Sequence, residues 1–128
     1  MPDPRTEEYE SEYKNTLDEI IAMLRRTGNF NTLLCLEALL QSEFINSRYR
    51  YAAIDSAHRY LNRHDKLHAL KVALYSLRLF TELKHDKELV SPGRPKEMRF
   101  TTMVLYEMPE DYACLAVLVA AYAHDMYR

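Results

Sequence analysis

The stretch DKLHALKVALYSLRLFTELK, residues 65–84, carries the clearest helical pattern in the chain. Leucines recur at positions 67, 70, 74 and 77, and steps of three and four residues place them along one side of an α-helix. Asp65 stands at the position of an N-cap, and the pattern continues to about Lys84 or Leu89. The apolar side is widened by Ala69, Val72, Ala73, Phe80 and Leu83. The stretch therefore predicts a long amphipathic helix that turns one side toward a core.

The opposite side of this helix carries a second row of side chains, which we call the polar ridge. It consists of His64, His68, Lys71, Tyr75, Arg78, Glu82 and His85. Steps of four and three residues keep all seven on one line. We expect this ridge to be exposed and, together with Arg48, Tyr49 and Arg50, to form a binding surface.

Three further helices are expected before this stretch. Residues 6–27 repeat apolar side chains at helical spacing, and Gly28 follows as a residue that ends a helix. Asn31 is a suitable N-cap for a second helix over residues 32–45. A third helix is predicted over residues 48–62.

The last part of the chain begins with a loop over residues 90–96, which contains two prolines and a glycine. Residues 97–108 fit either a helix or a strand, and we favour a helix. Pro109 is expected at the first position of a final helix that extends to about Tyr127. Residues 112–123 contain no charged side chain. A helix that is apolar on all sides is expected at the centre of a bundle or in a dimer interface.

The composition supports the same fold class. The chain has 128 residues, the size of one domain, and 48% of them are hydrophobic. Only two glycines are present, whereas strand-rich folds need glycine at turns and bulges. The sequence therefore predicts a single all-α domain over residues 1–128, a compact bundle of five or six helices.

The cysteines and the apolar segments bear on the location of the protein. Cys35 and Cys114 each stand in an apolar stretch, where buried, reduced thiols are expected. The N-terminal segment is acidic and lacks the apolar core of a secretory signal. The longest uncharged apolar run has twelve residues, while a membrane span needs about 17. A soluble, cytoplasmic protein with no membrane partner is expected.

Charge is distributed unevenly along the chain. Residues 1–19 hold seven acidic and two basic side chains, whereas residues 46–97 hold eleven basic and six acidic ones. Within segment 48–85 the basic residues alternate with tyrosines, a combination that suits RNA or DNA binding. Asp55, Asp65 and Glu82 interrupt this segment, and the net charge of the protein is −2, so a solvated helical face is favoured over nucleic-acid binding.

The spacing of two histidines bears on metal binding. His64 and His68 stand four residues apart, a spacing that presents two imidazoles to one ion on a helix. Both lie on the polar ridge, away from the leucine side, so a solvated basic surface is favoured over a metal site. No cofactor is predicted.

One short motif suggests catalysis. Arg59 and His64 are separated by four residues, and this Arg-x4-His spacing resembles the catalytic motif of the HEPN ribonucleases. The resemblance covers six residues and implies a small helical, usually dimeric domain in which the arginine and histidine act on the RNA phosphate and the ribose hydroxyl. Tyr60 departs from the family pattern, which has a small polar residue after the arginine.

The function that these patterns favour is non-catalytic. The two glycines stand 65 positions apart and form no phosphate-binding loop, and no catalytic triad order stands out. Ten tyrosines suit a protein interface. We therefore expect a small protein-binding regulator, of the inhibitor, adaptor or immunity type. A homodimer is a second hypothesis, and a ribonuclease or nucleic-acid-binding domain is the alternative.

Overall fold

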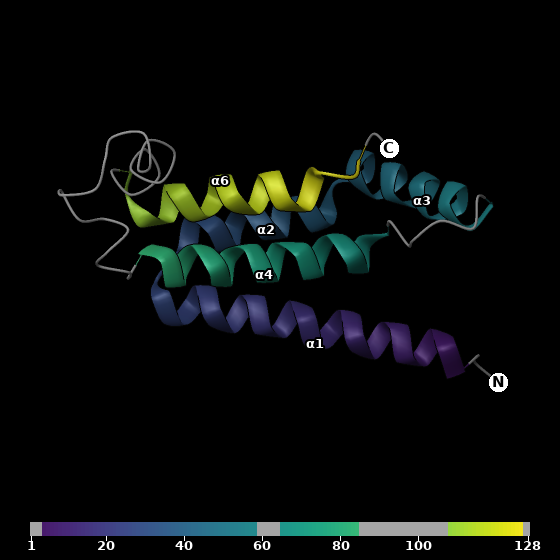
Figure 1. Ribbon diagram of the computed structural model, residues 1–128, viewed down its shortest axis with the longest axis horizontal. Coiled ribbons are helices and arrows are strands. Elements are labelled where there is room, and N and C mark those ends of the chain that lie inside the picture. Colours follow the sequence, from purple (N-terminus) through teal and green to yellow (C-terminus); the bar gives the residue numbers. More distant parts are fainter. Residues whose placement is uncertain (1–3, 59–64, 85–107, 127–128) are drawn as a thin grey trace.

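The computed structural model of the protein describes residues 4–58, 65–84 and 108–126. The described residues form five α-helices and no strand. The helices are α1 Pro4–Thr27, α2 Phe30–Gln41, α3 Glu43–His58, α4 Lys66–Lys84 and α6 Glu110–Ala123 (Figure 1). The predicted all-α bundle is therefore confirmed. The predicted loop 90–96 and residues 97–107 lie outside the described residues.

The helices pack with their axes roughly aligned (Figure 1). α1 and α4 lie side by side and run in the same direction, while α2 and α6 run in the opposite direction. α6 packs against both α4 and α2, and α4 also packs against α1. α3 extends past the end of α2. The C-terminal helix therefore has packing partners in both α4 and α2.

The core is built from the apolar sides that the sequence spacing predicts. Its buried side chains come chiefly from α1, α4 and α6, with Leu36 from α2 and Tyr49 from α3. The four leucines of the α4 stripe are Leu67, Leu70, Leu74 and Leu77, and all are buried. The opposite side of α6 is different, because Tyr112 and Val119 are exposed. The last helix is therefore not buried on all sides within one chain.

The end of α1 follows the predicted pattern. Gly28 has a φ of +74°, in the left-handed region that glycine adopts without strain. Its N–H donates to the Arg25 carbonyl, and the N–H of Asn29 donates to the Leu24 carbonyl. These two bonds form a Schellman motif, which satisfies carbonyls that the helix leaves open. The tight turn directs α2 back along α1.

The boundary between α2 and α3 differs from the prediction. The break falls at Ser42 rather than at Asn46 and Ser47, and it divides the segment predicted as one helix over 32–45. The Ser42 Oγ accepts a hydrogen bond from the Ile45 N–H at 3.3 Å, so this serine caps α3. Phe44 lies in α3 and is exposed.

The start of α2 is also shifted. Asn29, not Asn31, is the N-cap residue, and its side chain makes no cap hydrogen bond. Its Nδ2 donates instead to the Thr27 Oγ1 at 2.8 Å and contacts the Cys114 Sγ at 3.6 Å. The first turn of α2 is therefore capped by another residue.

That residue is Asp111, in the first turn of α6. Its carboxylate accepts hydrogen bonds from the N–H groups of Asn31 and Thr32, both at 2.9 Å, and from the Thr32 Oγ1 at 2.6 Å. A carboxylate at a helix N-terminus also favours the helix dipole. Asp111 thus caps α2 from a position about 80 residues away in the chain and joins two helices at one end of the bundle.

The final helix starts one residue later than predicted. Pro109 is the N-cap, with a φ of −51° and a ψ of 138°, and α6 begins at Glu110. The helix ends at Ala123 rather than near Tyr127, and residues 124–126 form a turn. His124 and Asp125 lie in that turn, so their side chains leave the helix at its C-terminal end.

Neither cysteine is in a disulfide, as expected: Cys114 is buried and Cys35 is half-buried. Among the described helices, none combines the length and the apolar character that crossing a membrane requires.

Candidate functional site

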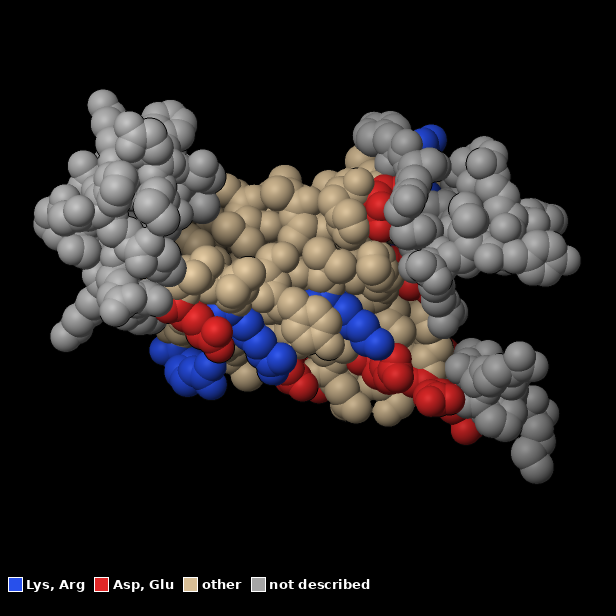
Figure 2. Space-filling model, in the orientation of Figure 1, with Lys and Arg blue, Asp and Glu red and all other residues tan. Residues whose placement is uncertain are grey.

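The polar ridge of α4 is partly occupied by acids of α1. The Lys71 Nζ lies 3.1 Å from the Glu12 Oε2, and the Arg78 guanidinium pairs with Glu19. Both pairs join residues 59 positions apart, and they recur at a seven-residue interval, as expected for two helices that run in the same direction. Figure 2 shows the charged side chains gathered along this α1–α4 edge. The uneven charge of the sequence is therefore partly neutralised inside the molecule.

The remaining ridge positions have different surroundings. Tyr75 and Glu82 are exposed, while His68 is half-buried and faces Asp125. His64 and His85 lie outside the described residues. The ridge is therefore a mixed surface rather than a continuous row of free basic groups.

The three residues predicted to extend this surface lie on α3. The Arg48 Nε donates to the Met126 carbonyl at 3.2 Å, at the end of the turn after α6. Arg50 is exposed and its guanidinium lies 3.2 Å from the Ser47 Oγ. Tyr49 is only 1% exposed and belongs to the core. Tyr49 is therefore removed from the predicted binding surface, because its ring is covered by α6.

Tyr49 fastens α3 to the C-terminal end of α6. Its hydroxyl donates to the Tyr122 carbonyl, and the two rings meet edge to face with centroids 5.6 Å apart. Burial raises the pKa of Tyr49 to about 12, and the negative charge of Asp125 acts in the same direction. Tyr49 is therefore a neutral structural hydrogen-bond donor at physiological pH.

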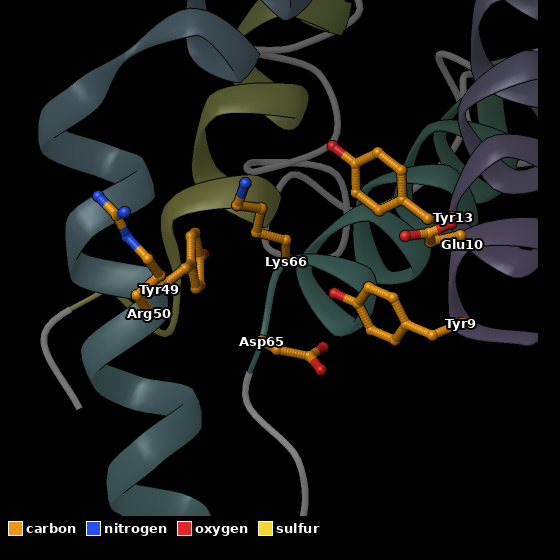
Figure 3. Close-up of a pocket in the computed structure, with 7 residues that line it drawn as sticks. All are labelled: Tyr9, Glu10, Tyr13, Tyr49, Arg50, Asp65 and Lys66. Carbon is orange, nitrogen blue, oxygen red and sulfur yellow. The ribbon is translucent and has the colours of Figure 1, made fainter. Parts of the chain in front are cut away.

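A cleft of about 320 Å³ opens beside Tyr49, between α1, α3 and the start of α4 (Figure 3). It is lined by Tyr9, Glu10, Tyr13, Tyr49, Arg50, Asp65 and Lys66. Tyr9 and Tyr13 are stacked with ring centroids 6.5 Å apart. Figure 3 shows both hydroxyls pointing away from α1, toward the lining residues of α3 and α4. The cleft combines aromatic walls with both acidic and basic groups. Its described lining residues include no serine, cysteine or histidine.

Asp65 performs the role that the sequence predicts. Its Oδ1 accepts a hydrogen bond from the His68 N–H at 3.0 Å, which is the geometry of an N-cap. This bond holds the first turn of α4 in place and with it the backbone of His68.

Next to that turn lies a cluster of His68, His124 and Asp125. The Asp125 Oδ2 is 3.4 Å from the His68 Nε2 and 2.9 Å from the His124 Nε2. The Asp125 side chain is 7% exposed, whereas the two imidazoles are about two-fifths exposed. We call this group the His–Asp cluster. It joins the start of α4 to the turn after α6.

A second surface feature is apolar. The outward sides of α4 and α6 expose Leu79, Leu83, Tyr112, Ala116, Val119 and Ala120. We call this group the α4–α6 face. The two helices pack against each other, and Figure 2 shows no charged side chain over the middle of α6 and the adjoining part of α4.

Neither the His–Asp cluster nor the α4–α6 face was predicted from the sequence. The pair His124–Asp125 stands almost at the end of the sequence, and nothing local relates it to His68, 56 positions earlier. The uncharged run 112–123 did signal an unusual helix, but the sequence does not say which side of it stays uncovered. Arg59 and His64, the two residues of the HEPN-like motif, lie outside the described residues.

Comparison of the chain with protein-family models, with curated proteins and with solved structures finds no match in any of the three.

Proposed function

We propose that this protein is a non-catalytic regulator that binds another protein through the α4–α6 face. One observation carries the proposal: residues 112–123 of α6 contain no charged side chain, yet one side of this helix is open to solvent. A helix on the surface of a globular protein normally turns charged and polar residues outward. An uncharged outer side is typical of a helix that a partner covers.

The neighbouring helix extends the same surface. Leu79 and Leu83 of α4 stand one helical turn apart and are 56% and 37% exposed. Tyr75, 60% exposed, stands one turn before Leu79 and borders the face on the side of the charged α1–α4 edge. A polar border around an apolar centre, with an aromatic ring that has a polar tip, is the usual composition of a protein interface.

The shape of the face suits a helical partner. Two helices packed side by side form a shallow apolar surface, in which an amphipathic helix places side chains spaced by three and four residues. An inhibitor, an adaptor or an immunity-type protein would use such a contact. The cytoplasm is its expected location, since two thiols outside any disulfide suit a reducing compartment.

The charge arrangement favours protein over nucleic acid as the partner. Lys71 and Arg78 are paired with acids of α1, and an RNA backbone would have to displace those carboxylates. The ribonuclease alternative with Arg59 and His64 stays a prediction.

The proposal is tested by a photo-crosslinking amino acid placed at one position of the face. We expect p-benzoyl-phenylalanine at Leu79 to form a discrete protein adduct in cells. The matched control carries it at Leu34, a leucine of α2 that is 63% exposed and outside the face. A second substitution, Val119→Lys on α6, is expected to abolish the Leu79 adduct, because it charges the neighbouring helix of the same face.

Each outcome of this experiment decides the matter. An adduct with a different protein, formed at Leu79 and lost with Val119→Lys, supports the proposal. An adduct between two copies of this chain would make the face a homodimer interface instead. No adduct at Leu79, or equal adducts at both positions that persist with Val119→Lys, would show that the face does not bind a protein.

A further inference from the structure

We propose that the His–Asp cluster is a binding site for a divalent transition metal ion of the zinc class, held by His68, His124 and Asp125. The inference is independent of the protein-binding proposal, because the cluster and the α4–α6 face share no residue. It joins the start of α4 to the turn after α6.

The three side chains have the spacing that such an ion requires. One donor atom of each residue lies within 4.8 Å of the other two. Zinc binds imidazole nitrogen and carboxylate oxygen at about 2.0–2.2 Å, so tetrahedral ligand atoms stand about 3.4 Å apart. The separation of 3.4 Å from the Asp125 Oδ2 to the His68 Nε2 matches that value, and the separation of 2.9 Å to the His124 Nε2 is shorter. Small rotations of exposed imidazoles would close the site around an ion.

The second nitrogen of His124 is held in the way that metal-binding histidines are held. Its Nδ1 lies 2.6 Å from the Ala121 carbonyl, and a carbonyl only accepts, so Nδ1 carries the proton. A backbone carbonyl on one ring nitrogen orients the ring and directs the lone pair of the other nitrogen toward the metal. Here that other nitrogen is Nε2, which points at Asp125.

This arrangement places two acceptors side by side at His124 and Asp125. With its proton on Nδ1, a neutral His124 presents a lone pair at Nε2, and the Asp125 Oδ2 at 2.9 Å is also an acceptor. Two acceptors at that separation repel unless a proton or a metal ion lies between them. A metal ion bound to both atoms uses both lone pairs.

The position of Asp125 also favours a cation. Its carboxylate is buried, and it follows the C-terminal end of α6, where the helix dipole is negative. A carboxylate there is stabilised by positive charge close to it. A divalent ion adds such charge, and the exposed edges of His68 and His124 leave a path for its entry.

The donor set selects the class of ion. Two imidazoles and one carboxylate suit zinc and its neighbours in the transition series, whereas magnesium prefers oxygen ligands and water. Three protein ligands leave the fourth tetrahedral position to a water molecule.

The test measures Zn²⁺ binding to tag-free full-length protein by competition with a chromophoric chelator. We expect one ion per chain, no competition by Mg²⁺, and a visible spectrum typical of tetrahedral coordination when Co²⁺ replaces zinc. His124→Ala and His68→Gln are each expected to lower zinc affinity at least about a hundredfold, more than the loss of an outer-shell partner costs. The control is Cys35→Ser, which removes a donor outside the cluster and is expected to leave affinity unchanged.

Circular dichroism shows whether each variant still folds. Both imidazoles are about two-fifths exposed, so either variant tests the site if the other one does not fold. Zinc binding that survives His124→Ala would overturn the proposal, including the case in which His64 and His68 alone hold the ion. Absence of zinc binding by the folded wild-type protein at micromolar concentrations would overturn it as well.

Discussion

Asp111 shows how one carboxylate holds two helices together. Burial acts to raise its pKa, but the hydrogen bonds from Thr32 and Asn31 outweigh burial and hold the pKa below the usual aspartate value. The native state therefore binds its proton less readily than the unfolded chain does. Its contribution to stability is present above the unfolded pKa, near 3.8, and is lost as the pH falls through the lower folded value.

We predict that Asp111→Asn lowers the free energy of unfolding at pH 7 by about 1–2 kcal/mol, since asparagine lacks the charge and keeps only one of the two oxygens that accept these hydrogen bonds. The difference in the free energy of unfolding between wild type and Asp111→Asn should be smaller near pH 3, because protonation of Asp111 weakens the wild-type contact too. Urea unfolding at both pH values measures it, and Asp18→Asn, an exposed acid of α1, serves as control. A gap that is the same at pH 3 and pH 7 would show that the carboxylate charge is unimportant.

Tyr49 and Tyr122 form a contact in which the two hydroxyls have opposite roles. The Tyr49 hydroxyl donates to a carbonyl, whereas the buried Tyr122 hydroxyl has no hydrogen-bond partner among the described residues. A buried hydroxyl without a partner loses its hydration and gains nothing in return. Burial also raises the pKa of Tyr122, so its ionised form is disfavoured in the fold.

We predict that Tyr49→Phe lowers the free energy of unfolding by about 1 kcal/mol, while Tyr122→Phe leaves it unchanged or raises it. The pKa of Tyr49, raised to about 12, adds a pH effect. Because the fold favours the neutral ring, this stability is complete below pH 10 and is lost as the pH rises toward 12. Thermal or urea unfolding of both variants at pH 7 and pH 11 checks this. Equal effects of the two substitutions would contradict it.

At the scale of elements, the turn after α1 decides where α2 is placed. A side chain at position 28 would meet no atom within 4 Å, so space does not require glycine there. The φ of +74° does, because residues with a Cβ are strained in that region.

Gly28→Ala is predicted to lower the free energy of unfolding by about 1 kcal/mol, because the left-handed backbone strains alanine. Gly28→Asn should cost clearly less, since asparagine tolerates this conformation. Chemical denaturation of the two variants compares them directly. If both cost the same, backbone strain is not the reason for glycine at this turn.

The pairing of α1 with α4 is also decided between elements. The segment that forms α1 is rich in acidic residues, and the segment that forms α4 carries the basic residues of the ridge, but neither segment indicates which helix it will pair with. The seven-residue interval brings Glu12 and Glu19 opposite Lys71 and Arg78 only because the helices lie parallel and in register. These pairs are about half exposed, so each contributes at most about 1 kcal/mol. Their effect is mainly to set alignment and to reduce the free basic charge of the ridge.

At the scale of the whole molecule, one side of α6 contributes to the stability of the core and the other side belongs to the proposed binding face. Leu118 and Val119 are neighbours in the sequence, yet Leu118 is fully buried in the core and Val119 lies on the α4–α6 face. We predict that Leu118→Ala lowers the free energy of unfolding by about 2–5 kcal/mol, because a buried cavity remains. Val119→Lys should change it by no more than about 0.5 kcal/mol.

The measurement is urea unfolding of each variant, followed for Val119→Lys by the Leu79 crosslinking assay. A folded Val119→Lys protein that no longer forms the adduct separates the binding face from the core. Strong destabilisation by Val119→Lys would instead place this residue within the packed interior of the single chain.

The local spacing of residues was sufficient to predict the helices and their buried sides. Steps of three and four residues identified the apolar side of α4, and Asp65 and Gly28 were recognised at its start and at the end of α1. These features depend on neighbours within one or two turns, so the sequence contains the information directly. The α2–α3 break at Ser42 was missed because a serine cap competes weakly with the apolar pattern around it.

The contacts between distant segments were decided by the tertiary structure alone. Asp111 caps α2, acids of α1 occupy the ridge, and His68 meets His124 and Asp125 because particular helices became neighbours in a particular direction. A helical pattern states which side is apolar, but it does not state which helix will cover that side. The sequence by itself therefore determined an all-α bundle with its core residues. Only packing determined the His–Asp cluster and the uncovered side of α6, because both depend on the relative placement of whole helices.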